Sequence, residues 1–283
     1  MTDGDVSARK RTAGPPGSPS VAPSLRDRVP GHLAIAELMK AQETIPKRHF
    51  VVRVLGKTPL TPETKALYHE AVGEIHVGEA LRALGSSWVV LHSVPVGNGE
   101  VDHLVIGPGG VFIITSRNHS RQAVWASQRT FMVGGIRYPD IRNMEFEMGR
   151  VERLLSTAAG RAIEVSGILA VVAPKSLTVR QQHRDVEVLS SAGVVAWLNE
   201  RKVVLSHDEV VAIAAAAERT TTWHNDPESD IDVIDLARFT KLRSEVVRAW
   251  RLQLGWAIAT TVIVVGVFLA VTHSILMTTL GFN

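Results

Sequence analysis

The 283-residue sequence contains no cysteine, and only 5% of its residues are aromatic. Without cysteine the chain forms no disulfide and no thiolate-ligated metal site, which agrees with a reducing compartment. The formal net charge is only +3, so charge alone does not indicate a nucleic-acid partner, which usually requires a clustered basic face. The first 30 residues hold no long apolar run, and we expect no signal peptide there. What is present is 45% hydrophobic residues, enough for a sizeable core.

Residues 1–47 are predicted to form a disordered tail followed by a short helix. Proline, glycine and serine dominate the first 30 positions, and such a segment buries too little surface to offset its ordering entropy. A short helix is expected over residues 32–41. Residues 48–55 alternate between polar and apolar side chains, which predicts a strand at a sheet edge.

Residues 48–225 are predicted to form one α/β domain, a mixed sheet flanked by helices. Thr61, Pro62 and Glu63 give a helix start of capping hydroxyl, proline and acid, and the apolar stripe continues to about Leu84. Further helices are expected over residues 143–158, 192–199 and 206–219. Strands are expected over residues 88–94, 101–107, 111–116, 123–127, 130–133, 136–138, 168–173, 186–189 and 203–205.

The central feature of this domain is a predicted hairpin of residues 101–107 and 111–116, joined by a Pro-Gly-Gly turn. Asp102 opens its first strand, and a polar run from Thr115 to His119 closes the second. Because the start of one hairpin strand lies beside the end of the next, we expect Asp102 to lie near Thr115 and Arg117. The sequence therefore predicts a polar site at one end of an apolar sheet.

The residues around this hairpin resemble a known family. The runs GEIHVGE at residues 73–79 and DHLVIGPGGVF at residues 102–112, followed by Asn118-His119, are similar to the nuclease-related domain, NERD, over roughly residues 70–200. The resemblance implies the restriction-endonuclease-like PD-(D/E)xK fold. In that fold a helix glutamate, a strand aspartate and an E-x-K motif hold a divalent metal ion and activate water.

Carried over by position, the resemblance assigns the strand aspartate to Asp102 and the helix acid to Glu74 or Glu79, with Mg²⁺ or Mn²⁺ as the ion. The two glutamates lie five residues apart, about 140° around a helix, so they do not both face one site. The E-x-K motif falls on Thr115-Ser116-Arg117. A hydroxyl is a poor replacement for a carboxylate around Mg²⁺, and arginine clamps phosphate but does not transfer protons.

Two further residues are candidates for contact with nucleic acid beside Arg117. His119 follows the second hairpin strand, and Lys175 follows the apolar run at residues 168–173. Each lies just beyond a predicted strand, where its side chain can reach the polar end of the sheet. We assign them the role of phosphate contacts, and Lys175 can also replace the lysine missing from the E-x-K motif.

Residues 252–282 contain no Asp, Glu, Lys or Arg and are predicted to cross a membrane once. Lys241, Arg243, Arg248 and Arg251 precede this segment, which by the positive-inside rule predicts a cytoplasmic N-terminal part at the cell membrane. Trp250 and Trp256 suit the interfacial belt. Residues 226–251 are expected to form an amphipathic linker helix.

These features together predict a membrane-anchored cytoplasmic nuclease-related protein that binds nucleic acid, with weak or lost metal-dependent phosphodiesterase activity. Because Thr115 and Arg117 replace the acid and the lysine of the E-x-K motif, a second hypothesis remains open. On that hypothesis the domain is a non-catalytic, membrane-tethered scaffold for a protein partner of unknown identity.

Overall fold

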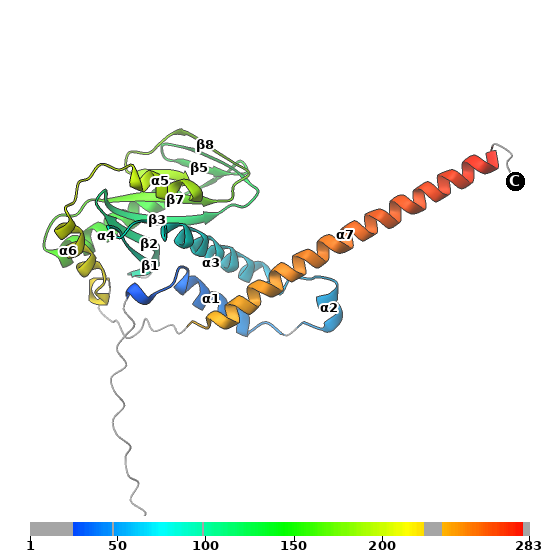
Figure 1. Cartoon of the computed structure of the whole chain (residues 1–283), viewed down its shortest axis with the longest axis horizontal. Coiled ribbons are helices and arrows are strands. Elements are labelled where there is room, and N and C mark those ends of the chain that lie inside the picture. Colours follow the sequence, from blue (N-terminus) through cyan, green and yellow to red (C-terminus); the bar gives the residue numbers. More distant parts are fainter. Residues whose placement is uncertain (1–24, 47, 98, 224–233, 280–283) are drawn as a thin grey trace, which may run out of the picture.

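The computed structural model describes residues 25–46, 48–97, 99–223 and 234–279, which form an α/β body with one long helix leaving it (Figure 1). The helices are α1 (His32–Glu43), α2 (Phe50–Val54), α3 (Pro62–Leu81), α4 (Asp140–Ala159), α5 (Val194–Asn199), α6 (His207–Ala217) and α7 (Leu236–Thr279). The strands are β1 (Val89–Val96), β2 (Gly99–Gly107), β3 (Gly110–Asn118), β4 (Ala123–Ser127), β5 (Thr130–Val133), β6 (Ile136–Tyr138), β7 (Val165–Val172), β8 (Ser176–Gln181) and β9 (Val186–Ser190).

The main sheet has five strands in the order β1-β2-β3-β7-β9. The first three strands are antiparallel, and β7 and β9 join them in parallel. Gly107 pairs with Gly110 across the hairpin turn, which confirms the predicted hairpin. The predicted fold class, a mixed sheet flanked by helices, is confirmed as well.

Both faces of the main sheet are covered by helices. Successive side chains of a strand point to opposite faces, so an apolar strand offers each face side chains that a helix can cover. Leu104, Ile106 and Ile113 pack with residues of α4 and α6 in one buried cluster. Val105, Phe112 and Ile114 pack with residues of α3 and α5 in a second cluster. The hairpin is therefore apolar along most of its length, and its polar residues are confined to the end where β2 starts and β3 stops.

A second, four-stranded sheet has the order β6-β5-β4-β8. Its strands β4, β5 and β6 coincide with the predicted ranges, whereas β8 was not predicted. β8 pairs in parallel with β4 and is exposed or half-buried throughout, so it lacks the apolar run that marks a buried strand. The strand predicted at residues 203–205 is wrong, because Val204 and Leu205 donate their backbone N–H groups to Pro108 O instead of joining a sheet.

The strand predicted at residues 48–55 is also wrong, since α2 occupies this segment. Its apolar side chains find no sheet edge to pair with. Instead, the segment lies against α7, where Trp256 Nε1 donates a hydrogen bond to Val54 O at 3.0 Å. Gly56 then ends the turn with φ of 76°, in the left-handed region that favours glycine.

α7 is a single continuous helix from Leu236, so the described part of the predicted linker and the predicted membrane segment form one element. The predictions for residues 1–24 and 226–233 lie outside the described residues. Near its start, Phe239 is buried against α1 and α3, with Leu242 and Val246 packed beside it. α1 therefore belongs to the folded body. Leu236–His273 is long and apolar enough to cross a membrane, and its most apolar window is 0% buried.

The close packing at the end of β2 gives a stability prediction. A Cβ at Gly107 would lie 2.1 Å from Trp88 Cε3, so the indole ring must move. We expect Gly107→Ala to lower the free energy of unfolding by about 1–3 kcal/mol, as overpacking does. Gly149→Ala is the matched control, because nothing lies within 4 Å of its added Cβ. It should stabilise α4 by about 0.5–1 kcal/mol in the same denaturant titration. Equal effects would contradict this packing.

Candidate functional site

Asp102 lies at the start of β2, beside the end of β3. Its Oδ2 atom accepts hydrogen bonds from Ser116 N at 2.7 Å and from Ser116 Oγ at 2.8 Å. The side chain is buried. Burial raises the pKa of Asp102, although Arg117 and the hydrogen bonds from Ser116 oppose that shift. The hairpin register thus holds one carboxylate oxygen in a fixed place and leaves Oδ1 without these bonds.

Glu74 on α3 lies beside Asp102 with its side chain fully buried. Neither carboxylate oxygen of Glu74 has a hydrogen-bond partner of normal geometry, although the Ser93 hydroxyl is close enough to oppose the rise of the Glu74 pKa. The helix approaches β3 closely because residue 73 is glycine: a Cβ there would lie 3.3 Å from Asn118 Cβ and 3.4 Å from Ser116 Oγ. Glu79 is exposed on the same helix. Of the two alternatives, the structure places Glu74 at the sheet end and leaves Glu79 in solvent.

Two more glutamates surround this pair, and the four residues Glu70, Glu74, Glu100 and Asp102 are called the acidic cluster below. Burial, Asp102 and Glu70 raise the pKa of Glu100 to about 8. Burial and Asp102 also raise the pKa of Glu70, which lies at the exposed rim. Burial, Asp102 and Glu100 raise the pKa of Glu74 well above its ordinary value. Burial is the largest cause of each shift, and repulsion between the neighbouring carboxylates adds to it.

The sequence reasoning missed Glu70 and Glu100, although periodicity offered a signal for both. Glu100 is two residues before Asp102, which places both on one side of a regular strand. Glu70 is four residues before Glu74, which places both on one face of a helix. Because only a single carboxylate was expected from each element, these two flanking acids were left out.

Arg117 was expected to contact phosphate, but in the structure it is paired with a carboxylate. Arg117 Nε donates a hydrogen bond to Asp140 Oδ1, the first residue of α4. Burial disfavours the cation, but Asp140 and Asp102 outweigh burial and raise the pKa of Arg117. Thr115 Oγ1 donates to Glu147 Oε2 at 3.4 Å. The guanidinium is therefore near Asp102 yet already held by a carboxylate.

His119 and Lys175 are not brought into the acidic cluster. The His119 ring packs on Phe131 and Tyr138, with centroid distances of 5.9 Å and 6.0 Å, over the second sheet. Burial lowers the pKa of His119, which makes a phosphate-binding cation less available there. Lys175 is exposed between β7 and β8, so its amine lies in solvent rather than among the buried carboxylates.

The donor set of the acidic cluster suits a hard divalent cation, because Mg²⁺ and Mn²⁺ prefer carboxylate oxygens. The unpartnered Glu74 carboxylate next to Asp102 is the structural observation in favour of such an ion. In the described part of the chain, however, no three His, Asp or Glu side chains converge as a formed metal site. The oxygens still available to a cation are those of Glu74, Oδ1 of Asp102 and Oε2 of Glu100, which is also buried without a hydrogen-bond partner.

Comparison with known proteins addresses the segment that carries these residues. Residues 69–172 match the family model of the nuclease-related domain, NERD. The matched NERD segment runs from α3 to β7 and contains the whole acidic cluster and the central hairpin. This match confirms the resemblance drawn from the sequence.

The chain was also compared with curated proteins and with solved structures. No match was found among curated proteins. Among solved structures, SfsA of Pyrococcus furiosus in complex with Ca²⁺ is similar at 15% identity, with 54% of each chain covered and a TM-score of 0.19. The similar region therefore spans about half the length of that protein.

The repulsion within the acidic cluster predicts how stability depends on pH. A carboxyl group whose pKa is raised by folding stays protonated while the unfolded chain ionises, so the free energy of unfolding falls as pH rises above about 4.5. For Glu100 this loss continues to about pH 8. Because burial and its acidic neighbours raise the pKa of Glu74 as well, we expect Glu74→Gln to reduce the loss of stability between pH 5 and pH 8.

The measurement is denaturant unfolding at both pH values with EDTA present. Comparing the change with pH removes any constant cost of the buried amide. Glu79→Gln is the matched control, because Glu79 is exposed on the same helix, and it should leave the pH dependence unaltered. Parallel profiles for the wild type and Glu74→Gln would show that Glu74 does not contribute to this repulsion.

Proposed function

We propose that the NERD segment binds nucleic acid beside a membrane, through a divalent cation held by Glu74 and Asp102, and that its phosphodiesterase activity is weak or lost. The observation that carries this proposal is the buried Glu74 carboxylate, which has no hydrogen-bond partner of normal geometry and lies next to Asp102. A cluster of carboxylates repels a phosphate group unless a cation lies between them. A bound cation would also offset the repulsion within the cluster.

Each residue of this site has a distinct task in the proposal. Ser116 fixes Oδ2 of Asp102 through two hydrogen bonds, which leaves Oδ1 and the Glu74 oxygens for the ion. Glu70 lies at the exposed rim, and Glu100, whose pKa is raised to about 8, becomes a further anionic oxygen donor only when it ionises. When bound, a divalent cation acts as a Lewis acid toward a phosphoryl oxygen and makes a water molecule more acidic. The chain's own contribution is to place the carboxylates and to exclude solvent from Glu74.

Weak or lost hydrolysis follows from the residues at the E-x-K position. Thr115 provides a hydroxyl where the family pattern has a carboxylate, and that hydroxyl bonds to Glu147. Arg117 provides a fixed cation that does not transfer protons at neutral pH, and it is paired with Asp140. The site therefore retains groups for cation binding and lacks a candidate proton-transfer group at the lysine position.

The proposed location is the cell membrane, with α7 as a single span and the NERD segment in the cytoplasm. Support comes from the apolar segment of α7 and from the basic residues Lys241, Arg243, Arg248 and Arg251 on its N-terminal side. A nucleic-acid site tethered in this way acts on molecules that approach the inner face of the membrane.

A second candidate function is a non-catalytic scaffold that binds a protein partner from the membrane. The observation that favours it is the pairing of Arg117 with Asp140. This ion pair joins the end of β3 to the start of α4, so the arginine has a structural role that requires no nucleic acid. On this hypothesis the acidic cluster would stay protonated in part and bind no phosphate.

The first test is binding and cleavage of labelled DNA and RNA by the full-length protein in detergent. We expect binding that requires Mg²⁺ or Mn²⁺ and weakens at least ~10-fold in Glu74→Gln, the equivalent of about 1.4 kcal/mol. Binding should also fall with increasing salt, as phosphate contacts do. Glu79→Gln should bind like the wild type, since its side chain is exposed away from the buried carboxylates.

Cleavage is measured in the same samples. Slow or absent cleavage in the wild type, with any residual activity lost in Asp102→Ala, agrees with the proposal. Binding without metal, or binding unchanged in Glu74→Gln, would contradict the role of the cation. Binding to neither nucleic acid would favour the scaffold.

The second test concerns the anchor. We expect the full-length protein to stay with membranes after alkaline carbonate extraction, because a span of about 20 apolar residues is not released by charge or pH. Deletion of residues 250–283 should move the protein into the carbonate-soluble fraction. Retention of the deleted form in the membrane pellet would show that α7 is not the anchor.

A further inference from the structure

Residues 48–57 form a small foot that is attached to α7 where the apolar part of that helix begins. The contact is close: a Cβ at Gly56 would lie 2.8 Å from both Ala249 O and Gln253 N. One turn further, Trp256 Nε1 donates to Val54 O at 3.0 Å. Since the uncharged segment of α7 starts at Leu252, the foot lies at the level where α7 would enter a bilayer.

The surface of this foot is strongly apolar. Phe50 is 77% exposed, Val51 is 64% exposed and Leu55 is 51% exposed. Large apolar side chains scattered singly on a surface need no explanation, but several together mark an interaction site. Figure 1 shows α2 beside α7, on the side of the α/β body from which that helix departs. The apolar patch therefore lies beside the part of α7 whose apolar side chains are exposed.

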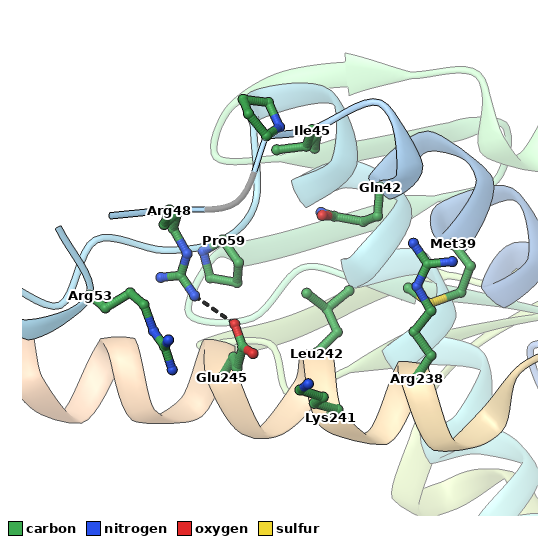
Figure 2. A pocket seen from close by; sticks show the side chains of 11 residues that line it. Met39, Gln42, Ile45, Arg48, Arg53, Pro59, Arg238, Lys241, Leu242 and Glu245 are labelled. Atoms are coloured by element: carbon green, nitrogen blue, oxygen red, sulfur yellow. Dashed lines mark hydrogen bonds and ion pairs between the residues drawn. The ribbon is translucent and has the colours of Figure 1, made fainter. Parts of the chain in front are cut away.

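Basic residues line two cavities beside this apolar patch. A cavity of about 430 Å³ between α1, the foot and α7 is lined by Arg48, Arg53, Arg238 and Lys241, with Glu245 among them (Figure 2). Glu245 pairs with Arg48 at 2.7 Å. An adjoining cavity of about 360 Å³ adds Arg248 and the ring of Phe50. Arg238 pairs with Glu43 at 2.8 Å, and cations still outnumber the one acid in both linings. Arg53 and Phe50 belong to the same short helix, α2.

We infer that the foot lies in the headgroup layer of the membrane, with Phe50, Val51 and Leu55 inserted and with Arg53 and its neighbours bound to anionic phospholipid phosphate. The contact of the foot with the start of the apolar segment of α7, and the combination of cations with exposed apolar side chains, argue for a bilayer surface as the occupant. Interfacial segments combine an apolar face with lysine and arginine in this way. The inference rests on the proposal that α7 spans a bilayer.

The foot has a consequence for the NERD segment. Because α7 packs against α1 and α3 through Phe239, and the foot holds α7 at residues 249–256, the α/β body is braced at two places. A headgroup-bound foot limits rotation of the body about the span. The acidic cluster, which α3 helps to form, is then held at a restricted height above the membrane.

The test uses the absence of cysteine from the sequence, because a single introduced cysteine takes a spin label at one position only. Labels are placed at Phe50→Cys in the foot, at Phe146→Cys on α4 and at Val264→Cys in the apolar part of α7. The native side chains at these three positions are 77%, 66% and 61% exposed. The full-length protein is reconstituted in vesicles, and collision with oxygen and with a water-soluble nickel chelate reports depth.

We expect the Val264→Cys label to collide with oxygen alone, the Phe146→Cys label to collide freely with the chelate, and the Phe50→Cys label to be at least ~5-fold protected from the chelate. If the Phe50→Cys label is accessible to the chelate while the Val264→Cys label is not, the inference is overturned and the anchor is unaffected. An aqueous Val264→Cys label overturns the anchor itself. If Phe50→Cys does not fold, Val51→Cys supplies the same measurement.

Lipid charge is tested with vesicles of phosphatidylcholine alone or with added phosphatidylglycerol. One basic residue near an anionic surface changes membrane binding by about 5-fold. We therefore expect added phosphatidylglycerol to raise the protected fraction of the foot label, and Arg53→Gln to reverse that rise. Arg180→Gln on β8 is the control and should have no effect. If phosphatidylglycerol has no effect on the foot label, the contact with headgroups is overturned. The same holds if inorganic phosphate in detergent changes the mobility of the label as much as phosphatidylglycerol does.

Discussion

The placement of one carboxylate, that of Glu74, governs the rest of the site. A charged group that is buried without a partner is strongly disfavoured, and Asp102 beside it adds repulsion rather than relief. Folding therefore leaves this region either protonated or in need of a cation. The large apolar clusters on both faces of the sheet supply the stability that allows such an unfavourable group to persist. Unfavourable buried charge of this kind is characteristic of functional sites.

The surrounding structure brings the two carboxylates together through small residues and backbone groups. Gly73 allows α3 to approach β3, and Ser116 binds Asp102 with both its amide and its hydroxyl. The hairpin register determines which residue of β3 meets Asp102. On the other side, Arg117 lies near Asp102 but is paired with Asp140. The result is an acidic site beside two arginines that already have partners, Arg117 with Asp140 and Arg28 with Ser93 O, which suits binding of a cation better than direct binding of phosphate.

Much of this fold could be predicted because local signals agreed with the tertiary packing. The capping residues Thr61 and Ser206 mark true helix starts, and the hairpin turn is where its glycines indicate. The strand predicted at residues 48–55 is wrong because an alternating pattern forms a strand only where a neighbouring strand is available for pairing. Glu74 and Glu79 were equivalent in sequence, since helix rotation is set by packing against a sheet. The Arg117–Asp140 pair joins residues 23 apart, and no pattern in either segment indicates it.

The continuity of α7 connects the two halves of the molecule physically. If the start of α7 and its apolar segment were separate elements, a flexible joint would separate the orientation of the NERD segment from that of the apolar segment. Instead one helix begins against α1 and α3 and becomes the apolar segment without interruption. A helix transmits orientation along its length, because its backbone hydrogen bonds resist bending. The direction of α7 through a membrane would therefore set the direction in which the acidic cluster faces, so that site and anchor act as one body.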